Sequence, residues 1–179
     1  MFAPLWGDSL LLAKNVIRHV RKNDIVLDLG TGVGIQGIFA AKSAKKVVCV
    51  DINPQAVKCA KLNVKFHKLN EKIKVLKSDL FSNIQGKFDL IIFNPPFRWF
   101  KPRSMLERGE VDFGYGHLRK FFNDIKNHLN KKGRALLVFS NSGDIRYFEK
   151  LIVENKFKNK ILDKKKINGW LYKIYLLRC

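Results

Sequence analysis

Short apolar runs alternate with amphipathic stretches along most of this 179-residue chain. Four runs of four to six mainly apolar residues, each bounded by charged or turn-forming residues, predict buried strands. These runs occupy residues 25–29, 47–50, 73–77 and 88–93. The stretches that separate the first three runs have the spacing of amphipathic helices, so we expect helices that end near residues 43 and 67.

A further helix is expected at the start of the chain, from about residue 8 to residue 22, with Asp8 as its cap. Its apolar face should contain Leu10, Ala13, Ile17 and Val20. The helix that follows the second strand has a clear start, because Asn53 can cap it and Pro54 suits the first helical position.

The second half of the chain begins with residues 98–116, which lack clean periodicity and predict an irregular loop. Long irregular loops in compact domains are often functional, and we expect this one to contact the substrate. A helix, a strand, a helix and a terminal hairpin should follow, at residues 117–130, 133–140, 144–155, and 161–162 with 171–177. Strands that alternate with helices predict a mostly parallel sheet, and the closing hairpin adds an antiparallel strand.

The net charge of +20, with a pI near 10.1, favours a polyanionic partner such as nucleic acid. Lysine-rich surfaces also make ordinary proteins basic, so a merely solvated surface is the alternative. The three cysteines form no CxxC motif, which leaves both a disulfide framework and a zinc site unsupported. The chain shows no signal peptide and no apolar stretch long enough for a membrane, so we expect a cytoplasmic protein with no membrane partner.

A glycine-rich turn directly follows the first strand, in the sequence Asp28-Leu29-Gly30-Thr31-Gly32-Val33-Gly34. Glycines let the backbone turn sharply and approach a ligand closely. Asp51 closes the next strand, where a carboxylate can accept both hydroxyls of a ribose. Together these features predict a site for a cofactor that contains a nucleoside.

The glycines alone leave two cofactors open. Gly32, Gly34 and Gly37 satisfy the GxGxxG pattern of dinucleotide-binding folds, which favours NAD. Two features oppose NAD: the first glycine after the strand is Gly30, and Asp28 precedes it. A carboxylate there would repel a pyrophosphate but attract an ammonium or sulfonium group.

The fourth strand ends in Asn94-Pro95-Pro96-Phe97. An open α/β sheet binds its ligands just beyond the carboxyl ends of its strands. The amide of Asn94 can accept hydrogen bonds, the two prolines restrict the backbone, and the ring of Phe97 can stack on a flat group. This combination suits a site that holds a planar –NH2 group.

The glycine turn, Asp51, Ser78-Asp79 and the NPPF motif, in this order, resemble the motifs of class I S-adenosylmethionine-dependent methyltransferases. The resemblance implies a Rossmann-like, doubly wound fold with a mostly parallel seven-stranded sheet and an antiparallel C-terminal hairpin strand. This fold would apply to residues 1–179 as one domain, with residues 1–23 as its N-terminal helix. The segment that runs from Ser78 through the NPPF motif is similar to the HemK/PrmC branch, which methylates a glutamine amide in release factors. The resemblance implies that S-adenosylmethionine is held by Asp28, Gly30, Thr31, Gly32, Gly34, Asp51, Ile52, Ser78, Asp79, Leu80 and Asn94. In that arrangement the glycine loop would hold the methionine part, Asp51 the ribose and Asp79 the adenine amine.

The expected reaction is direct displacement at a sulfonium methyl group, which needs no metal. Catalysis would come from Asn94, Pro95, Pro96 and Phe97, with the Asn94 oxygen and the Pro95 carbonyl each accepting one N–H of the acceptor. The expected substrate contacts are Phe97, Arg98, Trp99, Phe100, Arg103 and Arg108. Structural roles are the alternatives for three residues: Asp28 as a turn cap, Asp51 as a helix cap and Asp79 as an ordinary turn residue.

RNA, with an exocyclic base amine as acceptor, is favoured over a protein glutamine for two reasons. The charge is strongly positive, and Phe97 replaces the tyrosine of the NPPY motif usual in release-factor enzymes. No separate substrate-binding domain fits before residue 25 either. Single-domain relatives nevertheless methylate release factors together with a small zinc-binding activator protein, so that partner is also considered. An NAD-dependent oxidoreductase and a non-enzymatic RNA-binding module are the remote alternatives.

Overall fold

The structure, a computed structural model, describes residues 7–98, residue 101 and residues 111–179. The helices are α1 (Gly7–His19), α2 (Ile35–Ala41), α3 (Pro54–Phe66), the short 3-10 helix η2 (Phe113–Tyr115), α4 (Gly116–His128) and α5 (Ile145–Glu154). The strands are β1 (Ile25–Leu29), β2 (Lys46–Asp51), β3 (Ile73–Lys77), β4 (Phe88–Phe93), β5 (Leu129–Ser140), β6 (Lys158–Ile167) and β7 (Trp170–Arg178).

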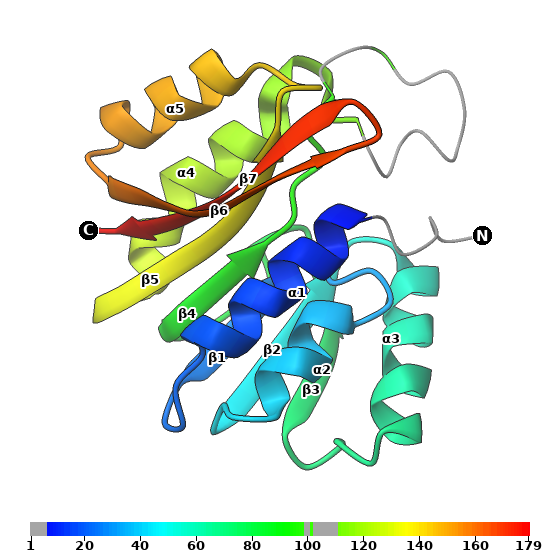
Figure 1. Ribbon diagram of the computed structural model, residues 1–179. Helices are drawn as coiled ribbons and strands as arrows, with labels where there is room; N and C mark the ends of the chain where they lie inside the picture. Colours follow the sequence, from blue (N-terminus) through cyan, green and yellow to red (C-terminus); the bar gives the residue numbers. More distant parts are fainter. Residues whose placement is uncertain (1–6, 99–100, 102–110) are drawn as a thin grey trace.

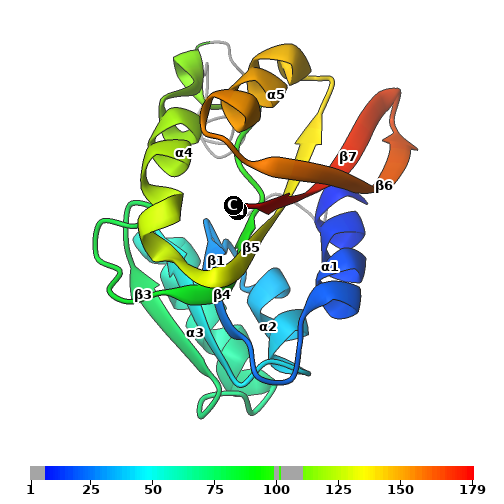
Figure 2. The same ribbon diagram turned by 90° about the vertical axis from the view of Figure 1, so that its left-hand side faces the viewer.

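These strands form one seven-stranded sheet in the order β3-β2-β1-β4-β5-β7-β6. The pairs from β3 to β5 are parallel, and β7 runs antiparallel to both β5 and β6. Helices α1, α2 and α3 cover one face, and α4 and α5 cover the other (Figures 1 and 2). The prediction of a doubly wound, mostly parallel sheet with an antiparallel hairpin strand is therefore confirmed.

The buried stretches of the central strands are mainly apolar because helices cover both faces of the sheet. On β4, Leu90 and Ile92 belong to the core under α1, α2 and α3. Ile91 and Phe93, between and beyond them, belong to the core under α4 and α5. The run at residues 88–93 thus supplies both cores, and it carries the NPPF motif at its end.

Helix α1 differs from the expectation in its start and its buried face. It begins at Gly7, so Asp8 lies in the first turn instead of capping the helix. Leu10 and Ile17, expected to be buried, are 50% and 45% exposed. The buried face can include Asn15 because its side chain donates to a backbone carbonyl of its own helix and to a carboxylate of β6. That face contains Asp8, Leu11, Leu12, Ala13, Asn15 and Val16.

The later strands are longer than predicted. Helix α4 ends at His128 and β5 starts at once with Leu129, which pairs with Phe88 of β4. Strands β6 and β7 extend through the whole hairpin, whose turn places Asn168 and Gly169 at positive φ, as a two-residue hairpin turn requires. Periodicity could not show the extent of β6, because this edge strand is mostly exposed and rich in lysine.

The predicted loop at residues 98–116 is only partly described. Arg98 forms an isolated bridge with Val111, and η2 and the start of α4 follow. The prediction that this segment contacts the substrate mostly concerns residues outside the described ones. Within the described residues, no helix is long and apolar enough to cross a membrane.

Candidate functional site

The parallel strands bring all the predicted motifs to one edge of the sheet. Residue pairing aligns Leu29 of β1 with both Val50 of β2 and Phe93 of β4, and aligns Asp51 with Lys77 of β3. The segments that follow these residues therefore begin side by side. They are the glycine loop, Asp51 itself, the turn at residues 78–80 and the NPPF motif.

The glycine loop has the backbone conformation that its sequence predicts. Gly30, Gly32 and Gly34 all have positive φ, at 60°, 55° and 89°. A Cβ added at Gly32 would meet nothing within 4 Å, so the loop leaves open space at that residue. Gly37 has another function: a Cβ there would lie 2.2 Å from the sulfur of Cys49, so this glycine permits close packing of α2 on β2.

The side chain of Asp28 holds the loop from inside. It is 1% exposed, and its Oδ2 accepts hydrogen bonds from the Thr31 hydroxyl at 2.5 Å and from the Gly37 amide at 3.0 Å. Burial raises the pKa of Asp28 to about 7, against the lowering effect of the Thr31 and Gly37 bonds. This geometry supports the turn-stabilising role that was the alternative for Asp28.

Asp51 is half-buried at the end of β2 and is held on both carboxylate oxygens. Oδ2 accepts from the Gly32 amide and Oδ1 from the Asn53 amide, each at 2.9 Å. Asn53 caps α3, since its side chain accepts from the Gln55 amide. Asp51 is therefore not the cap of this helix, and it links the glycine loop to the start of α3. Ile52, beside it, is 56% exposed.

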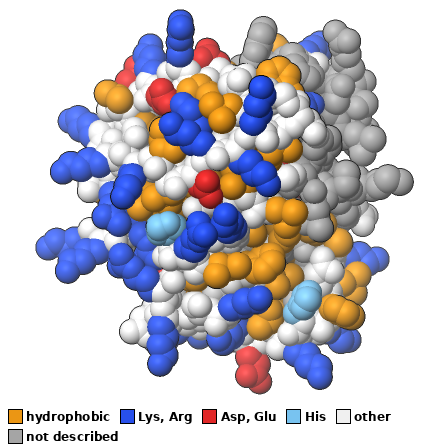
Figure 3. Space-filling model, viewed as in Figure 1, with side chains coloured by type: hydrophobic (Ala, Val, Ile, Leu, Met, Phe, Trp, Pro, Cys, Tyr) orange, Lys and Arg blue, Asp and Glu red, His pale blue; other side chains and the backbone are white. Residues whose placement is uncertain are grey.

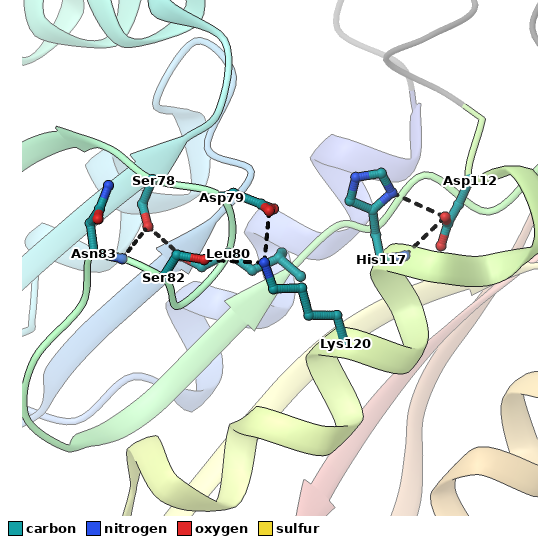
Figure 4. A network of polar contacts seen from close by, with 8 residues as sticks. All are labelled: Ser78, Asp79, Leu80, Ser82, Asn83, Asp112, His117 and Lys120. Atoms are coloured by element: carbon teal, nitrogen blue, oxygen red, sulfur yellow. Dashed lines mark hydrogen bonds and ion pairs between the residues drawn. The ribbon is translucent and has the colours of Figure 1, made fainter.

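The turn after β3 contains the next predicted residues (Figure 4). The hydroxyl of Ser78 donates to the Leu80 carbonyl and accepts from the Asn83 amide, which fixes the turn with Leu80 at positive φ. Asp79 points out of this turn toward α4 and forms an ion pair of 2.7 Å with Lys120. Both side chains of the pair are about 40% exposed, so Asp79 can exchange partners.

A second polar pair lies next to Asp79 (Figure 4). The His117 ring contacts the buried carboxylate of Asp112 at 3.0 Å. This bond raises the pKa of His117 despite its partial burial. Burial alone would raise the pKa of Asp112. The bonds from His117 and from the Leu118 amide outweigh burial, so the pKa of Asp112 lies below its usual value. Asp112 and His117, with Asp79 and Lys120, line a hollow of about 620 Å³.

The NPPF motif lies against α1. Asn94 is half-buried, and its Nδ2 donates to Asp8 Oδ2 at 3.4 Å and to Ser9 Oγ at 3.3 Å. Pro95 is buried and Pro96 is half-buried. The nitrogen of the Asn94 amide is thus directed at α1, and among the residues that the structure describes no hydrogen bond to its oxygen is found.

Phe97 is held by its ring and by its backbone. The half-buried ring makes edge contacts with Phe139 and Tyr172, at centroid distances of 5.8 and 6.0 Å. The Tyr115 hydroxyl donates to the Phe97 carbonyl at 3.3 Å and accepts from the Asp144 amide at 2.6 Å. A Cβ at residue 143 would lie 2.1 Å from that same carbonyl, so only glycine fits there.

Several residues of this site were not found from the sequence. Asp8 was interpreted as a helix cap, and Ser9, Tyr115, Lys120 and Gly143 carried no local signal. Conversely, four predicted substrate residues, Trp99, Phe100, Arg103 and Arg108, lie outside the described residues. Arg98 is described: it is half-buried, and its carbonyl accepts from the Asp112 amide. Across residues 7–98, 101 and 111–179, no three His, Cys, Asp or Glu side chains gather as a metal site would require.

Comparison with known proteins identifies the family of this chain. A family model described as the methyltransferase small domain matches residues 7–168. A Methanocaldococcus jannaschii protein named "Putative protein N5-glutamine methyltransferase" is 43% identical over 136 residues, which cover 70% of this chain and 66% of that protein. An Actinobacillus succinogenes ribosomal RNA small subunit methyltransferase C is 42% identical over 93 residues, covering 51% of this chain and 27% of that enzyme. The chain thus spans less than two thirds of either relative.

Solved structures show the same fold. The Mtq2–Trm112 complex of E. cuniculi matches with a TM-score of 0.77 and 21% identity, covering 98% of this chain and 97% of that chain. This agreement extends to the antiparallel C-terminal strand. The dinucleotide-binding fold has the strand order 3-2-1-4-5-6. Here the antiparallel β7 lies between β5 and β6, which removes support for the NAD interpretation.

Proposed function

This chain belongs to the methyltransferase small domain family, and from that premise we propose that it transfers a methyl group from S-adenosylmethionine to the side-chain amide nitrogen of a protein glutamine. The observation that carries the proposal is the held amide of Asn94 at the carboxyl edge of the sheet: its nitrogen is bound to α1, which would leave its oxygen for the acceptor. An N-methyltransferase needs an oriented acceptor at this position.

The residues present fit the cofactor. The open space at Gly32 admits a ligand against the loop backbone, and Asp51 presents a fixed carboxylate beside it. Asp79, a partly exposed carboxylate, would exchange Lys120 for the adenine amine. When bound, S-adenosylmethionine supplies a methyl group on a positively charged sulfur. The protein supplies position, and correct alignment of two reactants can lower a barrier by about 7–11 kcal/mol.

The acceptor amide is a poor nucleophile because its lone pair is delocalised. The Asn94 oxygen and the Pro95 carbonyl would each accept one of its N–H groups and hold the nitrogen in place. As the N–C bond forms and the bond from the methyl carbon to sulfur breaks, positive charge develops on that nitrogen, and the two oriented dipoles stabilise it. The methylated nitrogen would then lose one N–H proton to water, which leaves a neutral amide. The bonds from Asn94 to α1 and from Tyr115 to Phe97 keep both ends of the motif fixed, so little reorganisation is needed.

A protein glutamine now fits the site better than a nucleic-acid base. The Phe97 ring, expected to stack on a base, is half-buried and occupied by its edge contacts to Phe139 and Tyr172. It therefore forms a wall of the site more readily than an open stacking surface. The Methanocaldococcus jannaschii relative, named for glutamine methylation, matches over 70% of this chain. Lysine and arginine side chains are scattered over the described part of the face seen in Figure 3, which is consistent with a solvated surface.

RNA is the second candidate, because the net charge is +20 and the Actinobacillus succinogenes relative is named for ribosomal RNA methylation. One experiment separates the two candidates. The protein is incubated with methyl-labelled S-adenosylmethionine and, in separate reactions, with release factor, ribosomal proteins, ribosomal RNA and transfer RNA. We expect label on a glutamine of a protein; label only on RNA would replace this proposal with the RNA alternative.

The matched control for this experiment is Asn94→Ala. The variant should bind cofactor nearly as the wild type does but lose turnover by about 10²–10³-fold, as expected when one oriented group at a charge-developing centre is removed. Near-normal turnover by Asn94→Ala would contradict the mechanism for either acceptor.

We also propose that a small zinc-binding activator protein binds this enzyme, and co-purification with candidate partners tests this.

A further inference from the structure

Asp8 is a buried acidic residue that the fold does not explain. It lies in the first turn of α1 and is 8% exposed. Its Oδ2 accepts the bond from Asn94, whereas its Oδ1 is buried and has no hydrogen-bond partner among the residues that the structure describes. Burying a carboxylate that is not fully hydrogen-bonded destabilises a protein. The helix dipole favours an acidic residue in a first turn, but it favours an exposed one equally.

The start of α1, where Asp8 lies, contacts both the helix that follows the glycine loop and the NPPF motif. The carbonyl of the adjacent Ser9 accepts a 2.9 Å bond from the Gln36 side chain of α2. Helix α2 starts directly after the glycine loop, with Gly34 as its cap residue. The start of α1 is thus anchored to the cofactor side through Gln36 and to the NPPF motif through Asn94.

We propose that Asp8 is a positioning residue for methyl transfer, which holds the nitrogen of the Asn94 amide against α1 so that the amide oxygen faces the acceptor. An amide side chain can rotate to present either its oxygen or its nitrogen, and only the oxygen can accept an N–H from the substrate. A carboxylate partner selects one orientation, because a carboxylate accepts hydrogen bonds and donates none. This inference rests on the proposed role of Asn94 as the acceptor clamp.

The charge of Asp8 has a second effect through the same bond. A negative group that accepts from the nitrogen of an amide polarises that amide and places more electron density on its oxygen. The Asn94 oxygen is then a better partner for a nitrogen that becomes positive during the reaction. Asp8 acts through Asn94 and need not touch the substrate.

The test compares Asp8→Ala with Asp8→Asn on the wild-type acceptor. Asp8→Ala should lower kcat by about 10–100-fold, the scale of a small misplacement at a reacting centre. Its Kd for S-adenosylhomocysteine and its Tm should stay near the wild-type values. Asp8→Asn should have an intermediate kcat, because it keeps an acceptor of the same shape without the charge.

A double-mutant cycle shows whether Asp8 acts through Asn94. In the Asn94→Ala background, Asp8→Ala should cause no further loss of kcat, since residues that act as one unit are not additive. Asn15→Ala is the matched control, because Asn15 is also a buried polar residue of α1 but contacts Leu11 and Asp163, away from the motif. That variant should lower Tm and leave the kcat of folded protein unchanged.

The inference is overturned if Asp8→Ala keeps full kcat, or if it lowers Tm as Asn15→Ala does while folded protein stays fully active. Additive losses in the cycle would also overturn it. Failure of the proposed function looks different: the wild type would then label no glutamine. If RNA takes the label instead, the same variants are compared on RNA, with the same expected ratios.

Discussion

At the scale of single residues, the roles proposed for Asp51 and Asn94 predict that cofactor binding and turnover can be lost separately. Asp51→Ala should weaken the binding of S-adenosylhomocysteine, the product formed from the cofactor, because the carboxylate holds the glycine loop. The fold should stay intact, because this half-buried side chain lies outside the core. Thermal-shift titration measures this, since a ligand at 100 times its Kd stabilises a protein by about 2.7 kcal/mol. A wild type stabilised by NAD and not by S-adenosylhomocysteine would contradict the cofactor assignment.

Asp28 should make stability depend on pH. Its pKa is raised by burial to about 7 in the folded protein, above the ordinary value of 3.8. The folded state therefore binds more protons than the unfolded state between these values, so its contribution to stability is fully present below pH 3.8 and is lost as pH rises through 7. Asp28→Asn removes this titration. Urea unfolding should show the free energy of the wild type falling relative to that variant between pH 4 and pH 7, and parallel curves would refute this.

At the scale of elements, a buried ion pair fixes the middle of β5. Arg134 and Asp24, 3% and 6% exposed as side chains, meet at 2.6 Å. The same guanidinium donates to the carbonyls of Asp89 on β4 and His19 at the end of α1. Three elements and the turn before β1 therefore share one cation.

Arg134→Met should lower the free energy of unfolding by about 3–5 kcal/mol, because it leaves a buried carboxylate without its partner. Denaturation in urea measures the loss. Lys150→Met is the control: its pair with Glu154 is more than half exposed, and such pairs contribute about 0–1 kcal/mol. Similar losses in the two variants would show that burial does not govern the Arg134 pair.

The elements themselves were predictable where their residues are buried on both faces. The strand at residues 88–93 was found because every residue between Leu90 and Phe93 is buried. The extent of β6 and the buried face of α1 were not, because an exposed edge strand has no apolar period and α1 has apolar residues on several sides. Polar Asn15 lies inside because tertiary contacts override its preference for water.

At the scale of the whole molecule, the net charge of +20 should determine the affinity of the protein for polyanions. We expect single-stranded RNA to bind without specificity and to lose affinity steeply with salt, by a slope of about 0.7 for each phosphate contact. Methylation of the glutamine substrate should change little over the same salt range. Fluorescence anisotropy and label transfer, measured between 50 and 200 mM salt, test this.

The RNA alternative predicts a different result in that experiment. Label on RNA should then fall in parallel with RNA affinity, and Arg103→Glu with Arg108→Glu should abolish it. On the glutamine proposal the same double variant loses non-specific RNA affinity without losing protein methylation. The two outcomes differ, so the experiment shows whether the positive charge recognises an RNA substrate or only binds RNA without specificity.

The sequence by itself determined the sheet, the order of the motifs and the edge at which they meet. Chain direction accounts for this: parallel strands end at one edge, so the glycine loop, Asp51 and Asn94 had to lie together once the strands were recognised. Tertiary structure alone decided the supporting contacts. Asp8 meets Asn94 across 86 residues, and Lys120 meets Asp79 across 41. Such pairs depend on how helices pack on the sheet, and no local pattern records that packing.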